Sequence, residues 1–202
     1  ASTYVERERL FNLPGCSWED YDQSLLSEGG VLFNRSAKSL KLTPQIKKML
    51  GTQKQTMSPN ELIQALLMMK VDLLWNGGIG TYVKSSKESH LEVGDRANDS
   101  LRINGAQLQA KIVGEGGNLG LTQLGRIEYG IKGGRINTDA VDNAGGVDCS
   151  DNEVNIKILL NGLVQSGDLT VKQRNKILYD MTDEVSEIVL DDCYRQTHSL
   201  SI

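Results

Sequence analysis

The chain has 202 residues, of which 39% are hydrophobic and 24% are charged, and its formal net charge is −4. This length and composition suit one domain, or a domain with an appendage, and exclude a disordered, collagenous or disulfide-stapled chain. A slightly acidic chain without a basic stripe argues against binding nucleic acid by neutralising phosphates. The apolar runs are too short to span a bilayer, so we expect no membrane partner.

The cysteines and histidines of the chain predict free thiols. Cys16, Cys149 and Cys193 are an odd count without metal-ligand spacing, and two histidines are too few to complete a usual zinc pattern. We therefore expect no metal site and a reducing, cytoplasmic compartment. The first residues carry no Met and no targeting pattern, which indicates a piece of a longer polypeptide.

Residues 1–57 are the least regular part of the chain and are interpreted as the N-terminal part of the domain. Val5–Leu13 predicts a short helix, and Gly29–Phe33 predicts a turn into a short strand. Thr43-Pro44 then begins a helix that Gly51 ends, because proline suits the first helical position and glycine the position after the last.

A second region, residues 58–151, carries the predicted core. Ser58-Pro59-Asn60-Glu61 is a capping box, and the helix that it begins is expected to run to about Lys70 and to be mostly buried. Val71–Trp75 follows as a short apolar strand, which the Gly-rich segment Asn76–Gly80 ends. Residues 81–100 are polar and are expected to form an exposed excursion.

The same pattern then repeats. A weak helix is expected over Leu101–Gln109, and a second strand over Ala110–Val113, followed by the Gly-rich segment Gly114–Gly120. The next helix is expected to bury one apolar face: Leu124, Ile127 and Ile131. A third strand is predicted over Arg135–Thr138, followed by the Gly-rich segment Asp142–Val147.

Strands that alternate with Gly-rich loops and helices are typical of parallel βαβ units. We therefore predict an α/β fold with a Rossmann-like parallel sheet flanked by helices. Residues 152–202 form a third region of C-terminal helices, with an apolar stripe over Ile156–Val164 and a long final helix over 171–188. That final helix packs on its own domain or contacts another subunit.

Ligands of open parallel sheets bind beyond the carboxyl ends of the strands, so the three Gly-rich segments predict one shared cleft. Gly114–Gly120 nearly matches the dinucleotide fingerprint, but Leu119 stands where the last glycine is needed, so no pyrophosphate is assigned to it. A tight strand-to-helix turn is the alternative. The amides of Asn118 and Asn143 each offer a donor and an acceptor, to a ribose hydroxyl or a carboxamide.

Two further clusters of polar residues are not assigned to a cofactor or a substrate. The acidic cluster formed by Asp139, Asp142, Asp148 and Asp151 lacks the spacing of a calcium loop. Residues 95–99 are interpreted as a solvated or internally paired loop, with a place at the mouth of the cleft as the alternative.

Three motifs resemble successive signatures of the glutamate dehydrogenase superfamily: Val71–Ile79, Ala110–Asn118 and Asn143–Val147. The longer segment 114–160 resembles the very large bacterial NAD-specific glutamate dehydrogenases more closely still. The resemblance implies the C-terminal part of a nucleotide-binding domain, in an enzyme that oxidatively deaminates L-glutamate to 2-oxoglutarate and ammonium. It also implies NAD as cofactor, further domains in the parent chain, and a homo-oligomer.

The resemblance also assigns residues. Gly77 and Gly78 fall where the family backbone lies against the cofactor, and Asn118 falls beside Gly116 and Gly117 at the asparagine near the ribose. Asn143 falls on the residue that holds the nicotinamide carboxamide. The substrate side chain is assigned to two further residues, Val147 and Ser150.

Departures from the family pattern limit the expected activity. The GxGxxG turn and its strand are absent, so the fold is expected to be incomplete at its N-terminal side, and the family's catalytic lysine and aspartate belong to another domain. This chain alone is therefore expected to hold no catalytic residue and to be inactive. The alternatives are a non-catalytic nucleotide-sensing or assembly module, or a related leucine or phenylalanine dehydrogenase domain.

Overall fold

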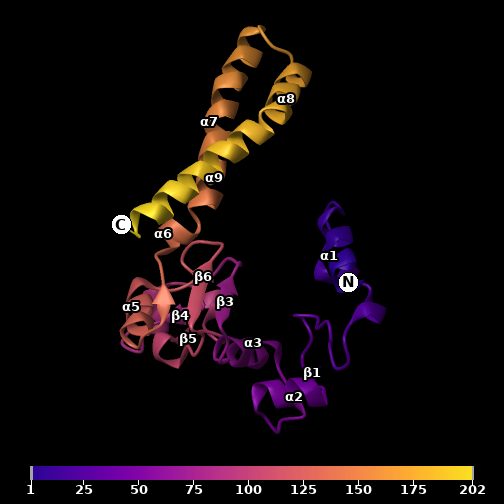
Figure 1. Cartoon of the computed structure of the whole chain (residues 1–202), viewed down its shortest axis with the longest axis vertical. Helices are drawn as coiled ribbons and strands as arrows, with labels where there is room; N and C mark the ends of the chain where they lie inside the picture. The colour runs from indigo at the N-terminus through magenta and orange to yellow at the C-terminus, as the bar shows by residue number, and fades with distance from the viewer. Residues whose placement is uncertain (1, 202) are drawn as a thin grey trace. The chain divides into compact units, whose positions relative to one another are not determined.

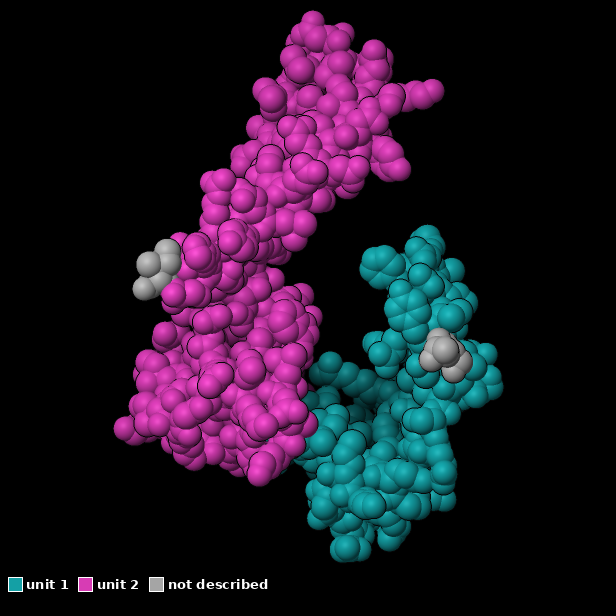
Figure 2. All heavy atoms as spheres, viewed as in Figure 1, with its two compact units in different colours: residues 1–69 teal, residues 70–202 magenta. Residues whose placement is uncertain are grey.

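The computed structural model describes residues 2–201, in two units that comprise residues 1–69 and 70–202 (Figures 1 and 2). The boundary falls after helix α3 and before the first strand of the main sheet. The predicted region boundaries after residues 57 and 151 stay predictions.

The first unit contains small elements around a small core. They are α1 (Ser2–Phe11), η1 (Trp18–Asp20), η2 (Gln23–Leu25), β1 (Leu40–Lys41), α2 (Pro44–Leu50), β2 (Thr56–Met57) and α3 (Pro59–Leu67). Strands β1 and β2 pair antiparallel. Four buried residues form the core: Leu40, Leu42, Met57 and Leu62.

The predicted starts of α2 and α3 are confirmed, whereas the first helix spans Ser2–Phe11 rather than Val5–Leu13. Thr43 caps α2 through its side chain, and Gly51 ends α2 in the left-handed region at φ 63°. Ser58 and Glu61 form both hydrogen bonds of the capping box that begins α3. These capping motifs depend only on residues that are close in the sequence, so they can be predicted from the sequence alone.

Two predictions for this unit are wrong. Residues 29–33 form no strand, because Gly29 turns at φ 80° and its carbonyl accepts the Thr43 hydroxyl instead of a ladder bond. Helix α3 ends at Leu67 rather than near Lys70, and it is half-buried rather than mostly buried. Its apolar residues point to several sides, and the small core of the unit covers Leu62 most fully.

The main sheet of the second unit confirms the α/β class and the parallel strands. It consists of β3 (Leu73–Asn76), β6 (Ile112–Glu115) and β7 (Arg135–Ile136), in the order β3-β6-β7. Both pairs are parallel, with Leu73 opposite Ile112 and Ile112 opposite Arg135. The three carboxyl ends therefore lie at one edge of the sheet.

Residues 81–100 correct part of the prediction of an exposed excursion: Thr81 and Val83–Ser85 are buried, whereas most of residues 86–97 are exposed as predicted. Strand β4 (Val83–Lys84) pairs parallel with β5 (Ile103–Asn104), and Val83 and Leu101 are only 2% and 1% exposed. The remaining elements are α4 (His90–Val93), η3 (Arg96–Asn98) and η4 (Gly105–Gln107), so the weak helix predicted over 101–109 is also wrong.

Arg102 explains how the polar groups in the buried part of this segment are satisfied. Its side chain is fully buried and donates to the carbonyls of Thr81 and Asp95 and to the carboxylate of Asp99. Asp95 in turn accepts from the Thr81 backbone and the Asn98 side chain, and these bonds lower the pKa of Asp95. Buried polar groups are tolerated when they are hydrogen-bonded, so the internally paired interpretation of 95–99 is confirmed.

Helix α5 (Gln123–Ile131) forms as predicted but buries the other face. Gly125, Arg126 and Tyr129 are buried, whereas Leu124, Ile127 and Ile131 are exposed. The buried face packs closely on the backbone of the small sheet, since a Cβ at Gly125 would lie 2.8 Å from the Lys84 carbonyl carbon.

The C-terminal helices are α6 (Asp139–Asp142), α7 (Ala144–Ser166), α8 (Val171–Asp180) and α9 (Thr182–Ser199). Helices α7 and α9 run side by side, as Figure 1 shows. The long final helix predicted over 171–188 is interrupted at Met181, where α8 ends and α9 begins. No helix within residues 2–201 is long and apolar enough to cross a membrane, and all three cysteines are free thiols.

Candidate functional site

The loops after β3 and β6 lie together at the carboxyl edge of the main sheet. The Gly116 N–H donates to the Asn76 carbonyl over 2.9 Å. A Cβ at Gly117 would lie 3.2 Å from the Gly78 carbonyl oxygen, so the loop that carries Gly77 and Gly78 touches the loop that carries Gly116 and Gly117. The structure thus brings the four glycines singled out in the sequence to one place.

The two asparagines of the sequence analysis meet at this edge. Asn143 Nδ2 donates to Asn118 Oδ1 over 3.1 Å, although the residues are 25 positions apart. Asn118 lies in the loop after β6, and Asn143 lies between α6 and α7. The prediction that both amides lie at one edge of the sheet is confirmed.

The third Gly-rich segment corrects the prediction of a loop. Gly145 and Gly146 lie in the first turn of helix α7 rather than in a loop after β7. A Cβ at Gly146 would lie 2.5 Å from Asn143 Oδ1. The absence of a side chain at Gly146 therefore makes room for the Asn143 amide.

Carboxylates of α6 hold the loop that carries Asn118. The Leu119 N–H donates to Asp139 Oδ2 over 2.8 Å, and the Glu115 N–H donates to Asp142 Oδ2 over 3.1 Å. Leu119 has φ 61°, a left-handed conformation that a leucine adopts only when its surroundings enforce it. The acidic cluster of the sequence thus has a local structural role that sequence patterns did not indicate.

The first turn of α5, which follows the segment Gly114–Gly120, already has a side-chain cap. Thr122 Oγ1 accepts the Gly125 N–H over 3.0 Å, so the side chain of the cap satisfies a donor of the first helical turn. A phosphate at this helix start would compete with that cap.

A cavity of about 610 Å³ adjoins Asn118. It is lined by Asn118, Leu119, Asp139, Ala140, Ala144, Val147, Asp148, Asp151, Asp192 and Gln196. Val147 therefore faces it from α7, whereas Ser150 is exposed on α7 and is not part of its lining. Asp192 and Gln196 come from α9, which no motif near the Gly-rich segments indicated.

The carboxylates of this cavity repel one another. Burial raises the pKa of Asp148, and the neighbouring carboxylates of Asp192 and Asp151 raise it further. The Oδ2 atom of Asp148 is buried without a hydrogen-bond partner among the described residues. Within residues 2–201, no group of three or more His, Cys, Asp or Glu side chains is arranged to hold a metal ion.

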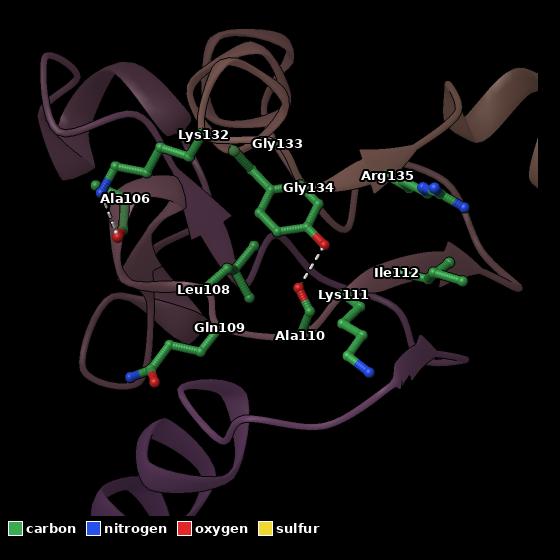
Figure 3. Close-up of a pocket in the computed structure, with 11 residues that line it drawn as sticks. Ala106, Leu108, Gln109, Ala110, Lys111, Ile112, Lys132, Gly133, Gly134 and Arg135 are labelled. Atoms are coloured by element: carbon green, nitrogen blue, oxygen red, sulfur yellow. Dashed lines mark hydrogen bonds between the residues drawn. The ribbon is translucent and has the colours of Figure 1, made fainter.

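A second cavity of similar volume lies at the opposite edge, where β6 and β7 begin (Figure 3). Lys132 donates to the Ala106 carbonyl over 2.8 Å, and Lys111 pairs with Asp72 over 2.6 Å. Figure 3 shows Lys111, Lys132 and Arg135 extending in different directions. These cations do not converge on one ligand, so the carboxyl edge is the better candidate.

Comparison with known proteins gives consistent matches. The family described as "Bacterial NAD-glutamate dehydrogenase, catalytic domain" matches residues 1–202. A protein of Halomonas elongata named NAD-specific glutamate dehydrogenase is 63% identical over 202 residues, and one of Pseudomonas aeruginosa with the same name is also 63% identical over 202 residues. A Mycobacterium tuberculosis protein of that name is 52% identical over 198 residues, which is 95% of this chain. The chain spans 12% of the length of each of these relatives.

Proposed function

This chain belongs to the family of the bacterial NAD-glutamate dehydrogenase catalytic domain, and from that premise we propose that it supplies part of the nicotinamide-cofactor cleft of such an enzyme. The parent protein oxidatively deaminates L-glutamate to 2-oxoglutarate and ammonium. The observation that carries the proposal is the contact between Asn118 and Asn143 at the carboxyl edge of a parallel sheet. The chain then forms the C-terminal part of a Rossmann-like nucleotide-binding domain.

The amides and glycines have separate roles in this proposal. NAD, when bound, supplies the hydride acceptor. Asn143 pairs with the nicotinamide carboxamide, since each amide offers the complement of the other, and Asn118 binds a ribose hydroxyl. Four glycines let the backbone approach the cofactor: Gly77, Gly78, Gly116 and Gly117.

The substrate lies on the side of α7. Val147 faces the cavity beside Asn118, where its methyl groups would pack against the methylenes of glutamate. The carboxylates of Asp148, Asp151 and Asp192 favour the α-ammonium group over the distal carboxylate, because like charges repel. The family resemblance places Ser150 at the distal carboxylate, to which its hydroxyl would donate from outside the lining of this cavity.

The amide roles are tested in the full-length enzyme that contains this chain. Asn118→Ala and Asn143→Ala should each raise the KM for NAD about 10-fold, the equivalent of one lost hydrogen bond. The double variant should raise the KM for NAD by less than the product of the two single effects, because the two side chains contact each other. Asn155→Ala, which removes an exposed amide further along α7, is the matched control. An unchanged KM for NAD in both single variants contradicts the proposal.

The substrate and the parent reaction are tested by comparing glutamate, leucine and phenylalanine as substrates of the same enzyme. We expect turnover of glutamate, and a higher KM for glutamate but not for NAD in Ser150→Ala. Preferred turnover of leucine or phenylalanine contradicts the substrate assignment. The 202-residue chain alone should show no turnover, since the catalytic lysine and aspartate are assigned to another domain.

A further inference from the structure

Trp75 is a large apolar side chain at the candidate site that the described residues leave uncovered. It lies in β3, one residue before Asn76, and it is 60% exposed. Side chains alternate along a strand, so Trp75 shares a face of the sheet with Leu73, which is also exposed. Trp75 lies near the carboxyl end of β3, beside the loop that carries Gly77 and Gly78.

The indole lies across glycines of the neighbouring strand. Trp75 is paired in register with Gly114. A Cβ at Gly114 would lie 2.8 Å from the indole, and one at Gly116 would lie 3.0 Å from it. Any side chain at either position would displace the ring. The absence of side chains at both positions thus makes room for the indole against the backbone of β6 and the loop after it.

The same contacts tie the indole to the amide pair. Gly116 touches the ring and is two residues before Asn118, so the Cα atoms of Gly116 and Asn118 are at most about 8 Å apart. On the β3 side, a Cβ at Gly77 would lie 3.3 Å from the indole Nε1. The indole N–H has no acceptor among the residues that the structure describes. Both loops of the candidate site therefore border this ring.

We infer that Trp75 is a cofactor-binding residue whose indole packs against the nicotinamide ring of NAD. An exposed indole that lies against glycine backbone offers a flat apolar surface and one free N–H, which suits a planar heteroaromatic ring with polar substituents. The inference rests on the proposed function. It adds an aromatic contact with the cofactor to the contacts proposed for the glycines and the amides.

The nicotinamide half is the occupant rather than the adenine half because of the nearby amides. The loop on which the indole lies also carries Asn118, and Asn143 contacts Asn118 directly. The proposed function assigns these side chains to the ribose and the carboxamide of the nicotinamide half. A ring held by those groups lies beside the indole.

The experiment measures cofactor binding by the full-length enzyme and its Trp75 variants. Trp75→Leu should raise the Kd for NADH about 5- to 20-fold, and Trp75→Phe should raise it less, because a smaller ring still packs. Energy transfer from tryptophan to bound NADH should decrease in Trp75→Phe. Trp18→Phe is the matched control for the loss of an exposed indole, since Trp18 is similarly exposed but belongs to neither loop of the candidate site, and its Kd for NADH should be unchanged. Inhibition by ADP-ribose, which lacks nicotinamide, should be unchanged in all variants.

Three results would overturn the inference. A Kd for NADH within twofold of wild type in both Trp75 variants means that the indole does not contact the cofactor. Equal weakening of NADH and ADP-ribose means that the ring beside Trp75 is adenine. If Trp75→Leu does not fold, unchanged energy transfer in Trp75→Phe decides against the inference. If the Asn118 and Asn143 variants raise the KM for NAD while the Trp75 variants bind NADH normally, the inference about Trp75 is wrong and the proposed function stands. If the Asn118, Asn143 and Trp75 variants all behave like the wild type, both the inference and the proposed function are contradicted.

Discussion

Arg126 Nη1 donates to the carboxylate of Glu115 over 2.5 Å, and their side chains are 6% and 0% exposed. Glu115 is the last residue of β6, directly before the loop that carries Asn118, and Arg126 lies in α5. The same Nη1 donates to the Asn137 carbonyl over 2.7 Å, after strand β7. One buried guanidinium thus links the ends of two strands to the helix between them.

Removing one partner of this pair should destabilise the second unit strongly. Arg126→Met leaves Glu115 buried without its counter-charge, and we expect a loss of about 3–5 kcal/mol in the free energy of unfolding. Glu115→Leu with Arg126→Met should lose less than the sum of the single variants, because no charge remains unpaired. Urea unfolding of the two single variants and the double variant measures this coupling. Additive losses would show that the pair contributes nothing beyond its packing.

Two glycines of helix α5 should respond oppositely to alanine. Gly125→Ala places a Cβ 2.8 Å from the Lys84 backbone, so we expect a loss of about 1–3 kcal/mol. Gly130→Ala meets no atom within 4 Å, and alanine favours the helix by about 0.5–1 kcal/mol. Urea unfolding of the two variants checks this. A stabilised Gly125→Ala would mean that α5 does not pack on β4 as described.

Glu61 should make the first unit sensitive to acid. The Ser58 backbone N–H and the Lys54 ammonium lower the pKa of Glu61 from 4.5 to about 2. A carboxyl whose pKa is lowered by folding stabilises the fold above its unfolded pKa, so this stability is lost as the pH falls from 4.5 toward about 2.

Thermal unfolding against pH, followed by circular dichroism, tests this. Glu61→Gln should flatten the profile over that interval, whereas Glu187→Gln, on exposed α9, should not. If the Tm of Glu61→Gln falls with decreasing pH as steeply as that of the wild type, the capping box has no role in acid stability.

Asp148 should have the opposite pH dependence. Its pKa is raised by burial and by Asp192, so its ionisation opposes folding. Stability from this group is greatest below the unfolded pKa of about 3.9 and falls as the pH rises through the raised folded pKa. Asp148→Asn keeps Oδ1, which accepts from Asn152, and removes the repulsion.

We therefore expect a higher Tm at neutral pH in Asp148→Asn and a smaller difference in acid. Asp180→Asn, which breaks an exposed pair with Lys176, is the control and should change the Tm little. Equal Tm shifts at both pH values would contradict the role of charge repulsion.

Much of the fold was predictable because its signals are local. The caps of α2 and α3 involve residues three apart, and β3 and β6 fall on short apolar runs that glycines follow. The meeting of Asn118 and Asn143 was predictable as well, since parallel strands present their carboxyl ends at one edge.

Other features depend on partners distant in the sequence, and only the tertiary structure decided them. The start of the segment 81–100 is buried, and Arg102 satisfies the carbonyls of Thr81 and Asp95, a pairing that polarity alone does not indicate. Helix α5 turns Gly125 and Tyr129 inward because its backbone must approach β4, whereas hydrophobic periodicity favours Leu124 and Ile127. The uncovered indole of Trp75 likewise follows from its register with Gly114, which no pattern within a single strand contains. The sequence by itself determined the local elements and the edge at which they meet, and the packing between distant segments decided which side chains that edge presents.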